Sequence, residues 1–400
     1  MQIATTASLP SSPVFRGLSA LALAALVIAV LTAAPIVSVW ANLFAGGTGD
    51  TWSHLVATVL PEYVLNTLWL CLGVGCGVIV VGVSTAWLVT MHDFPGRRVF
   101  AWTLVLPLAV PAYVMAYTYT DLLQFVGPVQ SGLRESFGWQ REDYWFPDVR
   151  TLGGAIAMFI FVLYPYVYLL ARTAFLERAS GMLEVGRSLG LGAWGSFFRI
   201  SLPLARPAIA AGATLALMET LADYGTVAYF SVQTFTTGIY RAWFSLGDRA
   251  AAAQLSAALL GFVVLVLLLE RTSRGRARFH NTTGRNRPHP GRRLSGLAAA
   301  GALFACAVPL LLGFLLPAGL LLNMALSEGD AQFGARFAQL AGNSFTLAAL
   351  TALLAVGFAL LLAYAARLSR SRWPGMMNRI VGLGYAVPGS VIAVGVLIPV

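Results

Sequence analysis

Long apolar stretches separated by short polar ones fill this chain. A bilayer core of about 30 Å takes about 20 mostly apolar residues in a helix, and these stretches reach that length. Backbone groups in lipid must bond within their own segment, and barrel strands need only about 10 alternating residues, so we predict helices. The pattern indicates an all-α polytopic membrane protein with nine spans, over residues 18–41, 64–90, 100–123, 151–171, 207–230, 250–269, 294–323, 343–366 and 380–400.

The first stretch, 18–41, has two interpretations. It is either a signal segment or a retained membrane helix. Its apolar length exceeds the 7–15 residues that are usual for the core of a signal segment, which favours a retained helix.

Composition supports the membrane assignment, because 58% of the residues are hydrophobic and 10% are charged. Soluble domains carry about 25% charged residues. The formal net charge is +10, and all 26 basic residues are arginines. They lie between the apolar runs, so we interpret them as orientation signals and expect no nucleic-acid partner. Without any lysine, the chain also lacks the phosphate-binding lysine of a P-loop.

The arginines predict which side of the membrane each loop occupies. Basic residues concentrate on the cytoplasmic side of bacterial membrane proteins. With the N-terminus and Arg16 in the cytoplasm, the outside loops keep only Arg134, Arg141, Arg150, Arg241, Arg249 and Arg336. We therefore expect a multi-pass protein of the bacterial plasma (inner) membrane with a cytoplasmic N-terminus.

Residues that commonly carry catalysis or bind metals are scattered. The cysteines lie inside apolar runs, and the first two fall on different helix faces, so we expect small core residues rather than metal ligands. The histidines form no cluster. We predict no catalytic site, no metal site and no cofactor in this chain; the residues concerned are Cys71, Cys76, Cys306, His54, His92, His280 and His289.

Two halves of the chain share landmarks, which indicates an internal repeat. Asn343 opens a helix 277 residues after Asn66 does, and Pro388 follows Pro111 by the same interval. A Pro-Gly pair also follows the corresponding helix in each half, at residues 95–96 and 374–375. The predicted domains are 1–60 (first helix and outer loop), 61–270 (first repeat), 271–293 (Arg-rich cytoplasmic linker), 294–342 (helix and outer loop opening the second half) and 343–400 (partial second repeat).

The cytoplasmic loop 172–206 is long for a connection between membrane helices. We predict a short amphipathic helix over 177–189, ended by a turn at Gly190 and Gly192, where glycine tolerates positive φ. Pro203 and Pro207 are then expected to break the chain before the next membrane helix. A short helix held in this way is suited to dock into a groove of a partner.

This loop resembles the EAA loop of binding-protein-dependent ABC importer permeases. The family pattern is Glu-Ala-Ala, three residues, Gly, nine residues, then Ile-x-Leu-Pro. The matching positions here are Glu184, Gly190, Ile200, Leu202 and Pro203, whereas Val185 and Gly186 depart from the two alanines. The resemblance implies that the loop couples this chain to an ATPase subunit.

A second resemblance concerns residues 217–256, which look like the region after the EAA loop in ferric-iron-type permeases. It implies a type I ABC importer permease fold with two tandem repeats, of which the second is incomplete here. By matching the first repeat, we expect the natural chain to continue for about 130–150 residues beyond Val400. Otherwise a dimer would be needed to engage two ATPases.

Two carboxylates, Glu219 and Asp223, lie four residues apart in the fifth apolar run and are predicted to share a helix face. A carboxylate at membrane depth costs about 2.5–3.5 kcal/mol. Either the pair lines a translocation path, with Tyr224 nearby, or it braces a helix broken around Gly225. Both interpretations stay open.

The resemblance implies a transport subunit that passes ferric iron from a separate solute-binding protein, driven by two ATPase subunits. Thiamine or sulfate are the alternative substrates. A channel or secondary transporter would not need the coupling loop, and a membrane enzyme would need a convergent set of His, Asp or Ser residues that the sequence does not display.

Overall fold

The computed structural model describes residues 14–43, 49–188, 190–274, 292–327, 334–369 and 373–398. Most of them are helical, so the predicted all-α fold is confirmed. One short exception is the parallel pairing of β1 (His92–Asp93) with β2 (Arg292–Arg293). The chain forms two compact units, the larger comprising α2 to α14 and the smaller built from α1 and α15 to α17.

Seven segments of the described residues are long and apolar enough to cross a membrane. They correspond to seven of the nine predicted spans. The other two predictions, 100–123 and 380–400, are wrong as single helices, because each is a pair of helices bent by 90° and 109° respectively. The bends fall at Val110-Pro111 and Val387-Pro388, where both valines have extended backbone. Proline disfavours the helical conformation of the residue before it, which is consistent with both breaks.

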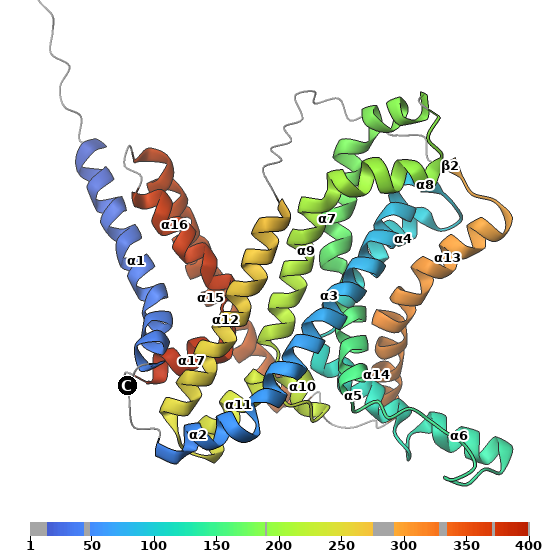
Figure 1. Ribbon diagram of the computed structural model, residues 1–400, viewed down its shortest axis with the longest axis horizontal. Helices are drawn as coiled ribbons and strands as arrows, with labels where there is room; N and C mark the ends of the chain where they lie inside the picture. Colours follow the sequence, from blue (N-terminus) through green and yellow to red (C-terminus); the bar gives the residue numbers. More distant parts are fainter. Residues whose placement is uncertain are drawn as a thin grey trace, which may run out of the picture. The chain divides into compact units, whose positions relative to one another are not determined.

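Four long helices form the body of the larger unit (Figure 1): α3 (Leu60–Met91), α7 (Leu152–Ser188), α9 (Leu202–Ala222) and α12 (Arg249–Arg274). Helix α7 lies between α3 and α9. A Cβ on Gly82 of α3 would lie 2.9 Å from the Tyr164 carbonyl oxygen, and one on Gly212 of α9 would lie 2.7 Å from Cα of Val167. These two glycines therefore permit close approach of the three backbones.

Shorter elements surround this bundle. They are α2 (Gly49–Thr58), α4 (Arg97–Thr103), η1 (Leu106–Ala109), α5 (Ala112–Leu123), α6 (Pro128–Phe137), α8 (Ala193–Ser196), η2 (Phe197–Ser201), α10 (Gly225–Tyr229), α11 (Phe235–Tyr240), η3 (Arg241–Ser245), α13 (Gly296–Leu310), η4 (Leu311–Leu315) and α14 (Leu316–Ser327). The segments η2, η3 and η4 are π-helical.

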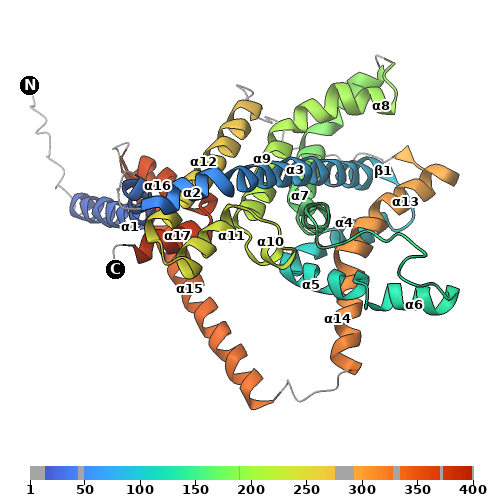
Figure 2. The ribbon, with the colours of Figure 1, turned by 60° about the horizontal axis from the view of Figure 1, so that its bottom comes forward.

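Helices α13 and α14 pack against other helices of the larger unit, although their sequence opens the second half of the chain (Figure 2). The Tyr119 hydroxyl donates to the Leu312 carbonyl at 2.6 Å. Gly313 lies against the Phe161 carbonyl, and the Leu294 amide donates to Asp93. Residues 292–327 are thus part of the bundle formed by the first half.

The smaller unit contains α1 (Val14–Leu43), α15 (Ala335–Leu368), α16 (Trp373–Leu383), η6 (Gly384–Ala386) and α17 (Gly389–Leu397). Ala25 and Ile28 of α1 are buried against Leu362 and Ala365 of α15. The first apolar run is therefore a continuous helix that packs on sequence from the other end of the chain.

The cysteine prediction is only partly confirmed. Cys306 is buried in the core, Cys71 is half-buried, and Cys76 is exposed on α3, so Cys76 is not a core residue. Within the described ranges, no three His, Cys, Asp or Glu side chains gather into a potential metal site.

Candidate coupling loop and translocation path

The loop 172–206 begins as a continuation of α7. This helix runs to Ser188 without interruption, so the prediction of a separate short helix over 177–189 is wrong. No proline occurs between residues 166 and 188, and nothing in this stretch ends the helix before the glycine turn. Glu184 lies on this last part of α7, and its side chain is outside the described residues.

The turn itself is at Gly190, whose φ is +80°. A Cβ at this position would meet nothing within 4 Å. Backbone conformation, and not lack of space, therefore makes glycine the suitable residue, since L-residues with a side chain rarely adopt positive φ. The predicted positive φ is confirmed at Gly190 and is wrong at Gly192, which lacks it.

After the turn the chain returns to the membrane through α8 and η2. Ile200 is half-buried in η2, and Leu202 and Pro203 are the first residues of α9. The predicted break at Pro203 and Pro207 is wrong, because η2 leads directly into α9. Proline is compatible with the first helical turn, where backbone amides have no intrahelical partner. Pro207, inside the helix, lacks the amide that would otherwise bond to the Pro203 carbonyl.

Aromatic rings that the sequence reasoning missed fix this return segment. The Phe197 ring lies 4.9 Å from that of Trp87 on α3, and Trp87 lies 5.4 Å from Phe175 on α7. Trp194 and Phe198 stack on each other at 6.0 Å and are 73% and 58% exposed. The available signal was the sequence Trp-Gly-Ser-Phe-Phe directly after the glycine turn.

At the opposite end of α9, Glu219 lies in the last turn of the helix and Asp223 lies just beyond it. The helix ends at Ala222, and Asp223 has extended backbone, so the prediction that Glu219 and Asp223 share a helix face is wrong. The Asp223 carboxylate accepts hydrogen bonds from the Thr226 and Val227 amides, at 2.9 and 3.3 Å, and from the Thr226 hydroxyl at 3.1 Å. These are the amides at the start of α10, which have no intrahelical partner.

Asp223 also holds the chain beyond α10, since its carbonyl accepts the Thr236 hydroxyl at 2.8 Å. This geometry favours the bracing interpretation for Asp223. Glu219 is half-buried within α9.

Tyr224 lies beside a pocket of about 310 Å³ that the sequence did not predict. Its ring is 39% exposed and stacks on Tyr240 at 3.9 Å. Arg241 is the one charged residue among those lining the pocket. Ser231 also lines it, and its backbone has a φ of +57°. Strained backbone and π-helical segments such as η3 recur at functional sites. Neither Glu219 nor Asp223 lines this pocket.

The helices and loop described above lie in a part of the sequence that is similar to known proteins. Residues 78–275 match the family described as the binding-protein-dependent transport system inner membrane component, and all the predicted site residues lie within that range. The molybdenum transport system permease protein ModB of Escherichia coli is 31% identical over 209 residues, which are 49% of this chain and 87% of that protein. The chain belongs to this permease family.

Two further relatives extend the comparison. The Fe(3+)-transport system permease protein FbpB 2 of Haemophilus influenzae is 30% identical over 350 residues, which are 84% of this permease. The aligned part covers 63% of the iron relative's own length. The sulfate transport system permease protein CysW of Escherichia coli is 26% identical over 215 residues, covering 52% of the chain and 68% of the relative.

Proposed function

We propose that this permease is the membrane-spanning subunit of an ATP-binding-cassette importer. It would receive its substrate from a solute-binding protein and be driven by two separate ATPase subunits, with no catalytic site of its own. The observation that carries the proposal is the loop at Gly190. Its positive φ ends α7 at the position where the permease pattern has its glycine, with Glu184, Ile200, Leu202 and Pro203 in register.

The coupling mechanism follows from the way this loop is built. The end of α7 would contact the ATPase, and the return segment is packed through Phe197 against Trp87, which in turn contacts Phe175. Because these side chains are in contact, a displacement of the loop by the ATPase would also move α3 and α7. The arrangement requires the loop and the N-terminus to be cytoplasmic and the protein to lie in the bacterial inner membrane.

For the substrate we propose ferric iron, supported by the alignment with the iron permease over 84% of the chain. Molybdate and sulfate are the competing substrates, since permeases named for both align with this chain. The pocket beside Tyr224 favours an oxyanion, because its one charged lining residue is the cation Arg241. Ferric iron, a hard cation, favours carboxylate and other oxygen ligands.

Uptake by the complete transporter in proteoliposomes tests both the importer assignment and the proposed substrate. ATP-dependent accumulation of iron, and not of molybdate or sulfate, is the expected result. Accumulation of an oxyanion alone would replace iron as the substrate. Uptake that persists without any ATPase subunit would overturn the importer assignment.

A further inference from the structure

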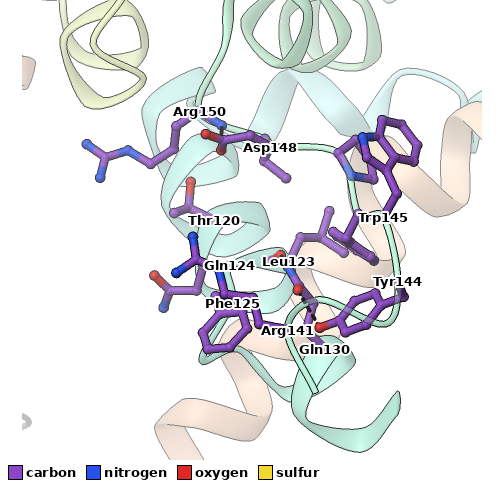
Figure 3. Close-up of a pocket in the computed structure, with 13 residues that line it drawn as sticks. Thr120, Leu123, Gln124, Phe125, Gln130, Arg141, Tyr144, Trp145, Asp148 and Arg150 are labelled. Carbon is purple, nitrogen blue, oxygen red and sulfur yellow. Dashed lines mark hydrogen bonds between the residues drawn. The ribbon is translucent and has the colours of Figure 1, made fainter. Parts of the chain in front are cut away.

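A second and larger pocket lies between α5 and the segment that leads into α7 (Figure 3). Its volume is about 370 Å³. Helix α5 contributes Thr120 and Leu123, and the segment 141–150 supplies most of the rest, with Thr120 on one side of the opening and Trp145 on the other. None of the predicted site residues lines it, so the importer mechanism leaves it unexplained.

The pocket has a built polar wall. The Tyr144 hydroxyl donates to Gln130 Oε1 at 2.8 Å, and the Gln130 amide donates to the Leu123 carbonyl at 2.8 Å. Arg134 donates to the Tyr144 hydroxyl at 3.0 Å, and its guanidinium lies 4.1 Å from the centre of the Phe125 ring. Three side chains, Gln130, Arg134 and Tyr144, are thus linked by hydrogen bonds in this wall.

One buried polar group in the pocket lacks a partner. Thr120 is 4% exposed, and its hydroxyl oxygen makes no hydrogen bond within the part of the chain that the structure describes. A buried hydroxyl without a partner costs free energy, which a ligand group at this position would recover. Thr120 therefore leaves an unused hydrogen-bonding group beside the pocket.

Charges of both signs line the same pocket. Arg150 is engaged, because its guanidinium donates to the Tyr229 carbonyl at 3.0 and 3.2 Å. Arg141 contacts the Phe125 ring at 5.3 Å and is exposed. Asp148 Oδ1 accepts the Arg150 amide at 2.9 Å, and Oδ2 makes no hydrogen bond with any described residue. A ligand with one anionic and one cationic group matches Arg141 and Asp148 together.

The rim of the pocket is apolar and exposed. Among the lining residues, Trp145 is 85% exposed and Phe125 is 42% exposed. The lining residues Asp148 to Arg150 come just before Leu152, where the spanning helix α7 begins. Where a spanning helix begins, aromatic side chains of membrane proteins are concentrated at the depth of the lipid headgroups. We propose that the pocket binds the headgroup of a zwitterionic phospholipid, with its phosphate at Arg141 and Thr120 and its ammonium group at Asp148.

With the N-terminus in the cytoplasm, this lipid belongs to the outer leaflet. The proposal does not depend on ATPase coupling or on the transported substrate. Its test can therefore fail while the importer assignment stands, and the reverse also holds.

Native mass spectrometry of the purified full chain tests the proposal with phosphatidylethanolamine and phosphatidylglycerol of identical acyl chains. Charge-assisted hydrogen bonds are the strong ones, so Arg141→Gln should weaken binding of both lipids about tenfold. Asp148→Asn should weaken binding of phosphatidylethanolamine alone. Thr120→Val, which keeps the shape and removes the hydroxyl, should weaken both a few-fold. Glu142→Gln is the matched control, because this exposed carboxylate on the same segment does not line the pocket.

Two results would overturn the proposal in this assay. One is unchanged binding in Arg141→Gln. The other is an unchanged ratio of the two lipids in Asp148→Asn. Soluble glycerophosphoethanolamine is the third ligand, and binding as tight as that of the lipid would assign the pocket to a soluble phosphate compound instead.

A photoreactive benzoylphenylalanine in place of Trp145 distinguishes lipid from protein in intact cells. Crosslinks to phospholipid are expected. Crosslinks confined to the solute-binding protein would assign this surface to protein docking and reject the lipid.

Discussion

The amide of Thr226 donates to the carboxylate of Asp223 at 2.9 Å, across the break between α9 and α10. Asp223 therefore acts at the end of one helix and the start of the next. The Val227 amide and the Thr226 hydroxyl point to the same carboxylate. An acidic residue inside an apolar stretch is thus explained locally, by the backbone amides that it satisfies where the helix is interrupted.

This geometry predicts different results for two substitutions of Asp223. Asparagine keeps an acceptor oxygen and the side-chain shape, so Asp223→Asn should leave uptake per folded molecule close to wild type. Asp223→Ala removes every one of these hydrogen bonds and should lower stability by about 1–2 kcal/mol. Thermal unfolding in detergent, measured beside uptake, separates the two effects.

Glu219 provides the comparison, because it lies within α9 and outside the Asp223 cap. If it lines the path of a cation, Glu219→Gln should reduce iron uptake with no loss of folded protein. Full uptake in the double amide variant would end the path interpretation for both carboxylates.

The turn after α7 predicts an effect specific to Gly190. A β-branched residue resists a φ of +80°, so Gly190→Val should distort the loop at a cost of about 1–2 kcal/mol. Membrane insertion should be unaffected, whereas ATPase binding and uptake should fall together. Gly192→Val is the matched control, since Gly192 is two residues away, has open space and lacks a positive φ. Wild-type uptake in Gly190→Val would contradict the coupling assignment.

Apolar periodicity predicted where the spans lie, because span length is imposed by the bilayer and is visible in composition. It did not predict the interruptions. Val110-Pro111 and Val387-Pro388 lie within runs apolar enough to read as single helices, and only the backbone preference before proline separates their halves. Asp223 was assigned to the fifth apolar run because hydropathy alone does not show where a helix ends.

The candidate site was predictable where local backbone chemistry decides, and not where distant segments meet. The positive φ of Gly190 follows from residue type. The stacking of Tyr224 on Tyr240 and the contact of Trp87 with Phe197 depend on how α3, α9 and α11 pack. No sequence spacing encodes such contacts.

The distribution of arginines predicts opposite accessibility for two serines. Ser136 lies exposed on α6, and Ser273 lies near the end of α12, where its hydroxyl oxygen is 3.3 Å from Arg206 Nε. A cysteine at position 136 should react with impermeant thiol reagents added to intact cells. A cysteine at 273 should react only after permeabilisation. Cys76 is exposed on α3 and has to be replaced by serine first, so that it gives no background labelling. Labelling in the reverse sense would invert the topology.

The contact between α9 and α7 predicts that two glycines in neighbouring helices respond oppositely to alanine. A Cβ at Gly212 would lie 2.7 Å from Cα of Val167 and 2.9 Å from the Tyr166 carbonyl oxygen. Both are backbone atoms, so the clash is relieved only if the helices separate, and overpacking of this kind costs about 1–3 kcal/mol.

Gly261 of α12 provides the contrast, because a Cβ built there has nothing within 4 Å. Alanine there should stabilise the helix by about 0.5–1 kcal/mol, because it restricts the unfolded backbone. Thermal unfolding of Gly212→Ala and Gly261→Ala in the same detergent checks the difference in sign. Equal stability of the two variants would mean that α9 does not approach α7 this closely in the membrane.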